Sequence, residues 1–504
     1  MDMCLICLSR LFSDHAVFAR NKEIRIFGQA KGKIHIEAVL KDKNGQILGM
    51  DSLNAAEGDF MLLLPPQTAQ TGCSLSVSDG KDVQTFHDIA IGDVYLANGQ
   101  SNMELELQNA DEGKALLQSH SNALVRYYNV PKFARPCVQA ESANANASWV
   151  PVRPGTGADM SAAAYFFAMK LQDALDVPIG IIDCYWGGTS ITCWMDEPTL
   201  RSAAEGQRFL KNYEQAAAGK TMEDYLQEEA AFQKEMQDWN DAANELKKED
   251  PGITTQQINA RIGPFPWHPP VGCGSPYRPH GLFDNMLSRV VPYALTGILF
   301  YQGEADTWRT DQYESLLTAY ILLLRRLFMD VDLPFINVQL PMWIEKGAQD
   351  SKNWPRLRME QYRVYRNLNN TGLAILLDQG EFDNIHPTNK RVVGERMYLE
   401  ALKTVYHQPA QSAVFACGKY TKDHALYIIT SAPVIERGKG EYLMEIAGAD
   451  GIFHPANVNL AGTVICLTSS AVDRPVMARY AWTDYAIVRL FGENGLPLAP
   501  FWLE

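Results

Sequence analysis

The 504-residue sequence predicts an α/β protein, in which a parallel-sheet core is flanked by a β-rich region at each end. Three observations support this fold class. Short alternating segments fill residues 1–90, continuous apolar segments interleaved with helical patterns fill 91–410, and short alternating segments return over 411–504. Because the chain is too long for one compact core, we expect these three stretches to be three domains.

The first region reads as strands joined by turns. The segments KEIRIFG, KIHIEAVL, FMLLLP and CSLSVSDG carry apolar residues at every second position, and Lys-Gly, Lys-Asn-Gly and Pro-Pro separate them. None of this stretch has a convincing helical pattern. We therefore predict a small antiparallel, sandwich-like domain.

The central region alternates between strands and helices. DVYLAN, PIGIIDCYW, LTGILFYQG, FINVQLP and GLAILLDQG are continuous apolar runs, as expected for strands that are covered on both faces. Helical patterns such as SAAAYFFAMKLQDAL and SLLTAYILLLRRLFM lie between several of them. This alternation predicts a parallel sheet.

Two segments interrupt or follow the central pattern. Residues 197–262 are highly charged, with apolar residues at helical spacing, which predicts an inserted amphipathic helical excursion. Because it follows one of the polar strand ends described below, we hypothesise that it forms a lid or wall of a site. The loop after it carries Trp267, His268, Tyr277 and His280, and is either a pocket rim or a plain connector. After residue 411, HALYIIT, EYLMEIA and TVICLTS predict a second β-region. Because both β-regions flank the core, the second is either a separate domain or packed with the first into one module.

Charge and composition exclude several classes of protein. A net charge of -14 leaves no basic stripe for a nucleic acid partner. No stretch has the roughly 18 apolar residues that a membrane span needs, and the N-terminus lacks the basic start of a signal peptide, so we expect a cytoplasmic protein. The nine cysteines follow no disulfide framework, and the lone Cys4–Cys7 pair has no partner motif that would complete a zinc site.

Four polar clusters, three of which contain glycine, follow strands of the predicted sheet. They are Gly99-Gln100-Ser101-Asn102-Met103, Trp186-Gly187-Gly188-Thr189, Gln302-Gly303-Glu304 and Asp383-Asn384-Ile385-His386-Pro387. Ligands of open α/β sheets bind at the carboxyl ends of the strands. The four clusters should therefore meet in one site.

The clusters contain the groups that acyl transfer needs. Ser101 is the candidate nucleophile, His386 the base that takes its proton, and Asp383 the acid that orients His386. The N–H groups of Ser101 and Gly188, with the Gln302 carboxamide, are candidates for an oxyanion hole. Taken singly, each has a structural alternative: Ser101 or Asn102 as a helix cap, the glycines as a turn, and Asp383 with His386 as a surface pair. Their joint occurrence at strand ends favours catalysis.

These motifs resemble the sialic acid-specific 9-O-acetylesterase family, the sialate O-acetylesterases of the SGNH hydrolase superfamily. Gly99 to Met103 is similar to the family's GQSNM motif, 186–189 and 301–304 to its second and third blocks, and 383–387 to its closing D-x-x-H-P motif. The resemblance implies a flavodoxin-like parallel sheet and a serine esterase that acts on O-acetylated sugars without a cofactor. Asn98 replaces the small residue usual in the family, which we expect to alter the pocket wall.

The identity of the sugar is left open by the sequence. The resemblance favours 9-O-acetylated sialic acid, with acetylated xylan or another plant oligosaccharide as the alternative, and a non-catalytic carbohydrate-binding protein or a lipid esterase as more remote ones. We expect sugar contacts from residues near the motifs, namely Gln100, Asn102, Glu304, Trp194 and Arg356, while Arg358 and Arg391 are further candidates by position only. No nucleic acid or membrane partner is expected, and the oligomeric state is open, a homodimer included.

Overall fold

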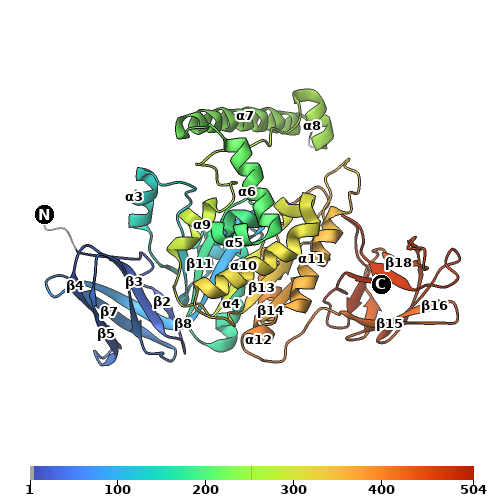
Figure 1. The fold of residues 1–504 in the computed structure, drawn as a ribbon. Helices are drawn as coiled ribbons and strands as arrows, with labels where there is room; N and C mark the ends of the chain where they lie inside the picture. Colours follow the sequence, from blue (N-terminus) through green and yellow to red (C-terminus); the bar gives the residue numbers. More distant parts are fainter. Residues whose placement is uncertain (1–4, 251) are drawn as a thin grey trace.

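The structure, a computed structural model, describes residues 5–250 and 252–504. An α/β core occupies the middle of the molecule, the N-terminal β-region lies on one side of it and the C-terminal β-region on the other (Figure 1). The core therefore separates the two β-regions, which corrects the alternative that they pack together as one module. The predicted fold class, a parallel-sheet core flanked by β-rich regions, is confirmed. Cys4 of the predicted Cys4–Cys7 pair lies outside the described residues, and Cys7 is exposed.

The N-terminal region is built from mostly antiparallel strands in two sheets, with β2 pairing in parallel with β8. One sheet has the order β1-β3-β6; in the other, β4 pairs with β5 and β7, and β7 pairs with β8. The strands are β1 (Ile6–Leu8), β2 (Val17–Ala19), β3 (Ile24–Ala30), β4 (Ile34–Lys41), β5 (Ile47–Ala55), β6 (Gly58–Leu64), β7 (Gln70–Ser78) and β8 (Val83–Gly99).

Strand β8 connects this region to the core without a break. Its first half pairs with β7 and β2, and its second half, from residue 93 onward, pairs with the core strands β11 and β12. The domain boundary expected near residue 90 therefore falls inside a single 17-residue strand. Every residue of β8 from Ile89 to Gly99 is buried, because core elements cover both faces of the strand.

The core sheet has parallel strands in the order β11-β8-β12-β13-β14, extended beyond β11 by β9 and the antiparallel edge strand β10. Numbered along the chain, the five central strands run 2-1-3-4-5, which is the flavodoxin-like order. In such sheets ligands bind where the strand order reverses, here at β8. The remaining core strands are β9 (Asn122–Asn129), β10 (Val150–Val152), β11 (Ile179–Tyr185), β12 (Gly297–Tyr301), β13 (Phe335–Gln339) and β14 (Thr371–Ile375).

Helices cover both faces of the core sheet. On one face Tyr95 of β8 packs edge-on against Phe167 of α4 (Ala162–Leu175), and α4 packs against α12 (Lys390–Thr404). On the other face Asn98 accepts a hydrogen bond from the Tyr320 hydroxyl of α10 (Tyr313–Leu327), which packs against α11 (Asn353–Asn367). The sequence predicted helices at both α4 and α10, because apolar residues there recur at helical spacing.

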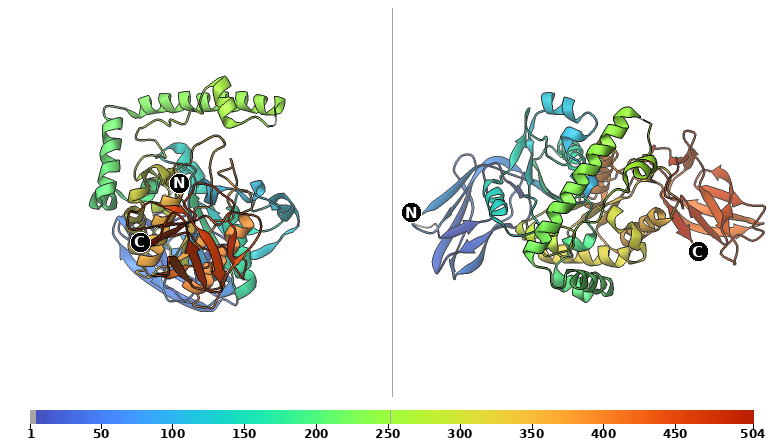
Figure 2. Two further views of the ribbon diagram at one scale, coloured as in Figure 1. Left: turned by 90° about the vertical axis from the view of Figure 1, so that its right-hand side faces the viewer. Right: turned by 90° about the horizontal axis from the view of Figure 1, so that it is seen from above.

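The charged insertion forms an arm above the core. Helix α6 (Ala204–Ala217) rises from the core and α7 (Met222–Glu249) lies across its top, followed by α8 (Thr255–Ile262), as Figure 2 shows. Thr221 and Asp224 form a capping box that fixes the start of α7. The other helices are α1 (Ser101–Glu104), α2 (Gly113–Ser119), α3 (Val138–Asn146), α5 (Glu197–Ser202) and α9 (Gly281–Asn285).

The C-terminal region contains three small antiparallel sheets, with the orders β15-β16-β21-β20, β17-β23 and β19-β18-β22-β24. Their strands are β15 (Ala416–Lys422), β16 (Ala425–Thr430), β17 (Val434–Glu436), β18 (Met444–Ala447), β19 (His454–Pro455), β20 (Asn457–Ala461), β21 (Val464–Thr468), β22 (Met477–Tyr480), β23 (Leu490–Gly492) and β24 (Phe501–Leu503).

A buried arginine joins the C-terminal region to the core. Arg358 of α11 is fully buried, and its guanidinium donates to the carbonyl oxygens of Ala481 and Thr483 in the C-terminal region and of Pro341 in the core. Burial lowers the pKa of this guanidinium to about 10, which still leaves it charged at neutral pH. Arg358 is therefore a structural residue that holds two regions together.

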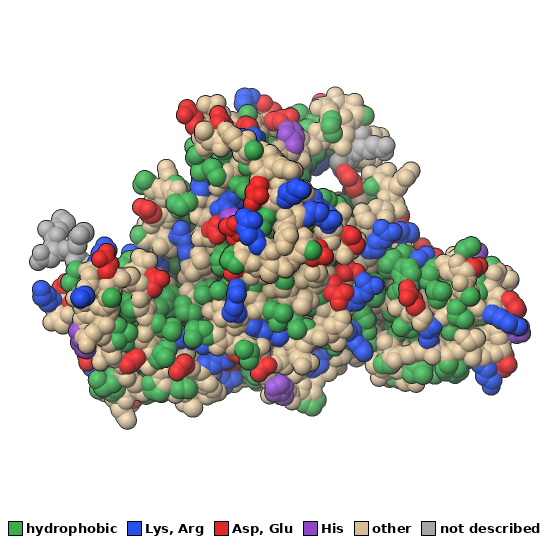
Figure 3. All heavy atoms as spheres, in the orientation of Figure 1, with side chains coloured by type: hydrophobic (Ala, Val, Ile, Leu, Met, Phe, Trp, Pro, Cys, Tyr) green, Lys and Arg blue, Asp and Glu red, His purple; other side chains and the backbone are tan. Residues whose placement is uncertain are grey.

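The distribution of charged side chains on the surface agrees with the expectation that the protein has no basic stripe. On the face seen in Figure 3, acidic and basic side chains are intermingled over the arm and the C-terminal region and form no single basic stripe. Across residues 5–250 and 252–504, none of the helices is both long and apolar enough to cross a membrane.

Candidate active site

Three parallel strands end at the same level, and the site is built on their ends. Gly99 at the end of β8 is in register with Tyr185 of β11 on one side and with Tyr301 of β12 on the other. The Trp186 N–H donates to the Gly99 carbonyl, and the Gln100 N–H donates to the Tyr301 carbonyl. The first three predicted clusters therefore leave the sheet side by side.

Gly99 makes the sharp turn into α1 possible. Its φ is +144°, and a Cβ there would lie 2.1 Å from the Tyr301 carbonyl oxygen, so no side chain fits. Helix α1 begins immediately afterwards, with Gln100 as its N-cap and Ser101 as its first residue. The helix cap therefore lies one position before Ser101 and two before Asn102, the two residues considered as caps from the sequence.

Ser101 and His386 meet at this turn. The Ser101 Oγ lies 2.8 Å from the His386 Nε2, a hydrogen bond that joins two residues 285 positions apart in the chain. Partial burial is the main reason that the pKa of His386 lies below its ordinary value; the nearby Lys390 lowers this pKa further, and the Glu104 carboxylate opposes both effects. The imidazole is therefore neutral at pH 7, as a general base must be.

Asp383 lies on the same turn as His386, but the two side chains do not bond to each other. The Asp383 Oδ1 accepts a hydrogen bond from the Lys346 N–H at 2.8 Å, and Asp383 has a left-handed backbone with φ of 61°. Within the described residues, no hydrogen bond reaches the His386 Nδ1. The predicted hydrogen bond between Asp383 and His386 is therefore absent from this conformation.

Two of the three predicted oxyanion donors are free. Among the residues that the structure describes, neither the Ser101 N–H nor the Gly188 N–H donates to an acceptor. Gly188 adopts a φ of +72° in the turn after β11, and the neighbouring Gly187 brings this turn within contact distance of Ser101, since a Cβ at Gly187 would lie 3.3 Å from the Ser101 Cβ. Both free N–H groups thus belong to the segments that meet at the Ser101 side chain.

Gln302, the third predicted donor, is fully committed elsewhere. It is completely buried, and its Nε2 donates to the Thr189 carbonyl, to Asp306 and to Gln100, while its Oε1 accepts from the Tyr313 hydroxyl. A carboxamide has only two N–H bonds, so none is left for a substrate. This corrects the prediction that Gln302 lines the oxyanion hole.

A buried polar chain lies directly beneath the Ser101–His386 pair. The Asn102 Nδ2 donates to the Glu304 Oε1 at 2.6 Å and to the Ile385 carbonyl at 2.9 Å, and the Asn102 Oδ1 accepts from the Lys390 Nζ at 2.6 Å. Burial raises the pKa of Glu304 and lowers that of Lys390 to about 8. Because Asn102 follows Ser101 and Ile385 precedes His386, one side chain ties the two halves of the pair together.

Several residues expected to contact sugar are unable to do so. Gln100, Asn102 and Glu304 are buried in the polar networks just described, and Trp194 is completely buried with its Nε1 donating to Thr189. These four residues hold the turn in place, which corrects their assignment as sugar contacts.

The other residues predicted to contact sugar also lie away from the turn that carries Ser101. Arg356 lines a cavity between α11 and the C-terminal region, away from Ser101. Arg358 is buried, and Arg391 forms an ion pair with Glu112. Asn98 is also buried, with its Nδ2 donating to the Cys184 carbonyl, so it is not part of a pocket wall.

The loop after the insertion forms a rim at the site. A Cβ on Gly188 would lie 2.9 Å from the Trp267 ring and 3.4 Å from the Tyr277 ring, so both rings contact the glycine turn. Of the two alternatives for this loop, the structure thus favours the pocket rim. Lys390 and Glu104 also lie at the site and were not among the predicted residues; their only signal in the sequence is their closeness to His386 and Ser101.

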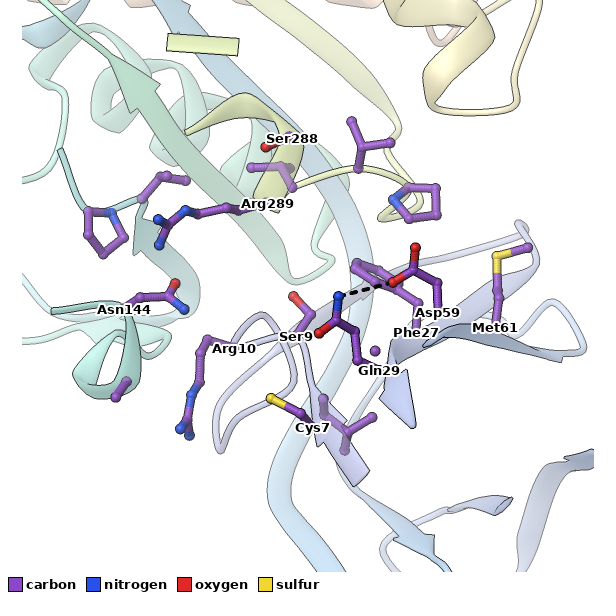
Figure 4. Close-up of a pocket in the computed structure, with 18 of the residues that line it drawn as sticks. Cys7, Ser9, Arg10, Phe27, Gln29, Asp59, Met61, Asn144, Ser288 and Arg289 are labelled. Carbon is purple, nitrogen blue, oxygen red and sulfur yellow. Dashed lines mark hydrogen bonds between the residues drawn. The ribbon is translucent and has the colours of Figure 1, made fainter. Parts of the chain in front are cut away.

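A separate groove of about 920 Å³ lies at the junction of the N-terminal region and the core, with Phe27, Asp59, Asn144 and Arg289 among its lining residues (Figure 4). It is not lined by Ser101 or His386. Across the described residues, no group of three or more His, Cys, Asp or Glu residues is arranged to hold a metal ion.

Comparisons with known proteins agree with this geometry. Residues 267–403 match the family model for carbohydrate esterase, sialic acid-specific acetylesterase. The chain is 26% identical to the sialate O-acetylesterase of Mus musculus over 343 residues, 64% of this chain and 58% of that protein, and 25% identical to that of Rattus norvegicus over 473 residues, 86% and 81%. The match thus spans less than two thirds of the mouse protein.

A solved structure extends the similarity to nearly the whole chain. The carbohydrate acetylesterase XAC1771 from Xanthomonas citri superposes with a TM-score of 0.76 at 25% identity, covering 99% of both chains. These matches confirm the family resemblance expected from the sequence: residues 267–403 are similar to the sialic acid-specific acetylesterase family of carbohydrate esterases, and the whole chain is similar in fold to a carbohydrate acetylesterase.

Proposed function

We propose that the protein is a serine-dependent carbohydrate O-acetylesterase. The observation that carries the proposal is the 2.8 Å hydrogen bond between the Ser101 Oγ and the His386 Nε2 at the end of β8. A serine hydroxyl becomes a useful nucleophile only when a base can take its proton, and a neutral imidazole is such a base. The match of residues 267–403 to a carbohydrate esterase family model supports the same reaction class.

The proposed reaction has two steps. His386 takes the Ser101 proton as the Oγ attacks the acetyl carbonyl, and the Ser101 and Gly188 N–H groups hold the negative oxygen that forms. His386 then gives the proton to the departing sugar hydroxyl, which leaves an acetyl-serine. A water molecule, activated by His386, attacks this ester and releases acetate.

Asp383 is the proposed acid of the triad. Its Oδ2 accepts no hydrogen bond within the described residues, and it lies three positions before His386 on an exposed turn. A rotation of this turn that brings the carboxylate to the His386 Nδ1 would stabilise the imidazolium as it forms.

The proposed substrate is an acetyl ester on a sugar, with 9-O-acetylated sialic acid first because the mammalian relatives carry the name sialate O-acetylesterase. Acetylated xylan and other plant oligosaccharides are the alternative. Acetate release from acetylated sialic acid, xylo-oligosaccharides and manno-oligosaccharides, measured side by side, separates these substrates.

Replacing Ser101 tests the nucleophile. Ser101→Ala should lower kcat/KM for an aryl acetate by about 10³-fold or more, because the oxyanion donors alone give only residual catalysis. Ser119→Ala, an exposed serine at the end of α2, is the matched control and should retain wild-type activity. Activity of Ser101→Ala within about tenfold of wild type would show that another residue is the nucleophile.

A further inference from the structure

An aromatic rim lies beside the turn that carries Ser101, and the proposed reaction assigns no role to it. The Trp267 ring contacts Gly188, whose N–H is a proposed oxyanion donor, and the adjoining Gly187 contacts Ser101. A sugar whose acetyl group reaches Ser101 must therefore lie close to the Trp267 ring. Hydrolysis of a small acetate does not require this ring.

Trp267 is exposed but firmly held. Trp267 is 49% exposed and the neighbouring Phe265 is 39% exposed. Their two rings are nearly parallel, with 9° between their planes and 6.3 Å between their centroids. Tyr277 and Phe232 pack edge-on against Trp267, and Trp239 packs edge-on against Phe265. Two fixed, exposed rings next to a reactive serine indicate a binding surface, since scattered apolar residues would not be ordered in this way.

The surface continues into a cavity beneath α7. This cavity has a volume of about 450 Å³ and is lined in part by Phe265, Trp239, Glu235 and Asp238. The Glu235 Oε2 accepts a hydrogen bond from the His268 Nε2 at 3.1 Å, and the Asp238 Oδ2 accepts one from the Lys234 Nζ at 2.6 Å. None of the described residues that line the cavity is itself Lys or Arg. Aromatic rings with carboxylate acceptors suit an uncharged sugar that carries hydroxyl donors, and they disfavour an anionic group.

We propose that Trp267 and Phe265 form a subsite for an uncharged pyranose ring that adjoins the acetylated sugar. This inference rests on the proposed function, and it specifies the substrate as a glycan of two or more sugars. The C–H face of the pyranose stacks on the Trp267 ring, because aromatic faces carry the negative part of the ring quadrupole. The arm formed by α6 and α7 supports this subsite, since Phe232 and Trp239 belong to α7.

The first test compares short and long substrates. We would measure kcat/KM for acetylated xylose against acetylated xylotetraose, and for free 9-O-acetylated sialic acid against the same sugar attached to lactose. For whichever pair the wild type hydrolyses, kcat/KM should be roughly tenfold higher for the longer substrate, because one good stacking contact has about this effect. Trp267→Ala should remove this preference, and Trp267→Phe should retain most of it.

The matched control is Tyr420→Ala, which removes a 46% exposed aromatic ring from β15 of the C-terminal region and should leave the length preference unchanged. A binding measurement serves as the second readout. In a Ser101→Ala background, calorimetry with non-acetylated xylotetraose and lactose should show binding to one of them that Trp267→Ala weakens by roughly tenfold.

The outcomes separate the subsite from the proposed function. If the wild type hydrolyses an aryl acetate but none of the sugar esters, the proposed function is wrong. The calorimetric measurement with non-acetylated sugars then tests the subsite independently. A wild type without length preference, or a Trp267→Ala variant that keeps it, overturns the subsite, as does the absence of binding in calorimetry. If Trp267→Ala changes the molecular mass in light scattering and leaves the length preference intact, the rings form an interface between copies of the chain and the subsite is also overturned.

Discussion

At the scale of single residues, the charges around His386 determine the pH at which the proposed base works. Burial and Lys390 lower the pKa of His386, so the neutral, active imidazole should persist to lower pH than it would in an unperturbed histidine. kcat/KM should therefore fall only as the pH drops below this lowered pKa. A pH profile of aryl acetate hydrolysis measures this acidic limb directly.

Two substitutions should move the acidic limb in opposite directions. Lys390→Met removes a positive charge that disfavours the imidazolium, so the pKa of His386 and the acidic limb should rise. Glu104→Gln removes a negative charge that favours the imidazolium, so the limb should move to lower pH. Equal profiles for both variants would mean that the limb reports a group other than His386.

Asn102 should matter for both stability and catalysis. Asn102→Ala leaves Lys390 and Glu304 buried without their shared partner and should cost about 1–3 kcal/mol of unfolding free energy. It also removes the link to the Ile385 carbonyl, so kcat should fall while KM changes little. Chemical denaturation measures the loss of stability, and kinetics at a temperature where the variant is folded measure the loss of activity. A less stable variant with a normal kcat would show that Asn102 does not position His386.

The sequence was sufficient to predict that Ser101 and His386 meet, because both follow apolar strands whose ends share one edge of a sheet. It was not sufficient to predict where the other side chains point. Gln302 and Trp194 also lie near strand ends, yet they turn inward and are buried by partners such as Tyr313 and Thr189. For Gln302 the inward direction also depends on hydrogen bonds to Gln100 and Thr189, more than a hundred residues away in the chain, and no local sequence pattern encodes them.

At the scale of elements, the close approach of β8 and β12 makes the turn at Gly99 sensitive to substitution. Gly99→Ala would place a Cβ against the Tyr301 carbonyl and impose an unfavourable φ, which should cost about 1–3 kcal/mol. Because Ser101 is two residues further on, activity should fall together with the melting temperature.

Gly45→Ala, at an open left-handed turn in the N-terminal region, is the control: it should lower the melting temperature through backbone strain and leave kcat unchanged. An active Gly99→Ala enzyme would show that the turn tolerates displacement.

Elements with strong periodicity were the ones that sequence predicted well. The continuous apolar strands β11 and β12 and the helices α4 and α10 occur where the patterns indicated. The path of the arm was not predictable, because α7 has few buried residues and contacts the loop after the insertion through Tyr225, Phe232 and Trp239. Its position follows from those few contacts and from the loop that returns to the core.

At the scale of the whole molecule, Arg358 joins the core to the C-terminal region. Arg358→Leu would leave the carbonyls of Ala481 and Thr483 without their donor and should cost about 1.5–3 kcal/mol. We expect the C-terminal region to become more sensitive to limited proteolysis before the core is cleaved. The control is Arg356→Leu, because that side chain is exposed. Simultaneous cleavage of both regions would show that they unfold as one unit.

Strand β8 has a consequence for how this chain can be divided and recombined. At about 3.3 Å per residue its 17 residues extend for roughly 56 Å, from the N-terminal sheet to the Ser101 turn. A gene fragment that starts at residue 91 would begin within this strand and would remove the pairing of its first half with β7. Fusion proteins and chimaeras should therefore exchange residues 5–410 as one cassette, and a shuffled library with crossovers between 83 and 99 should yield few folded members.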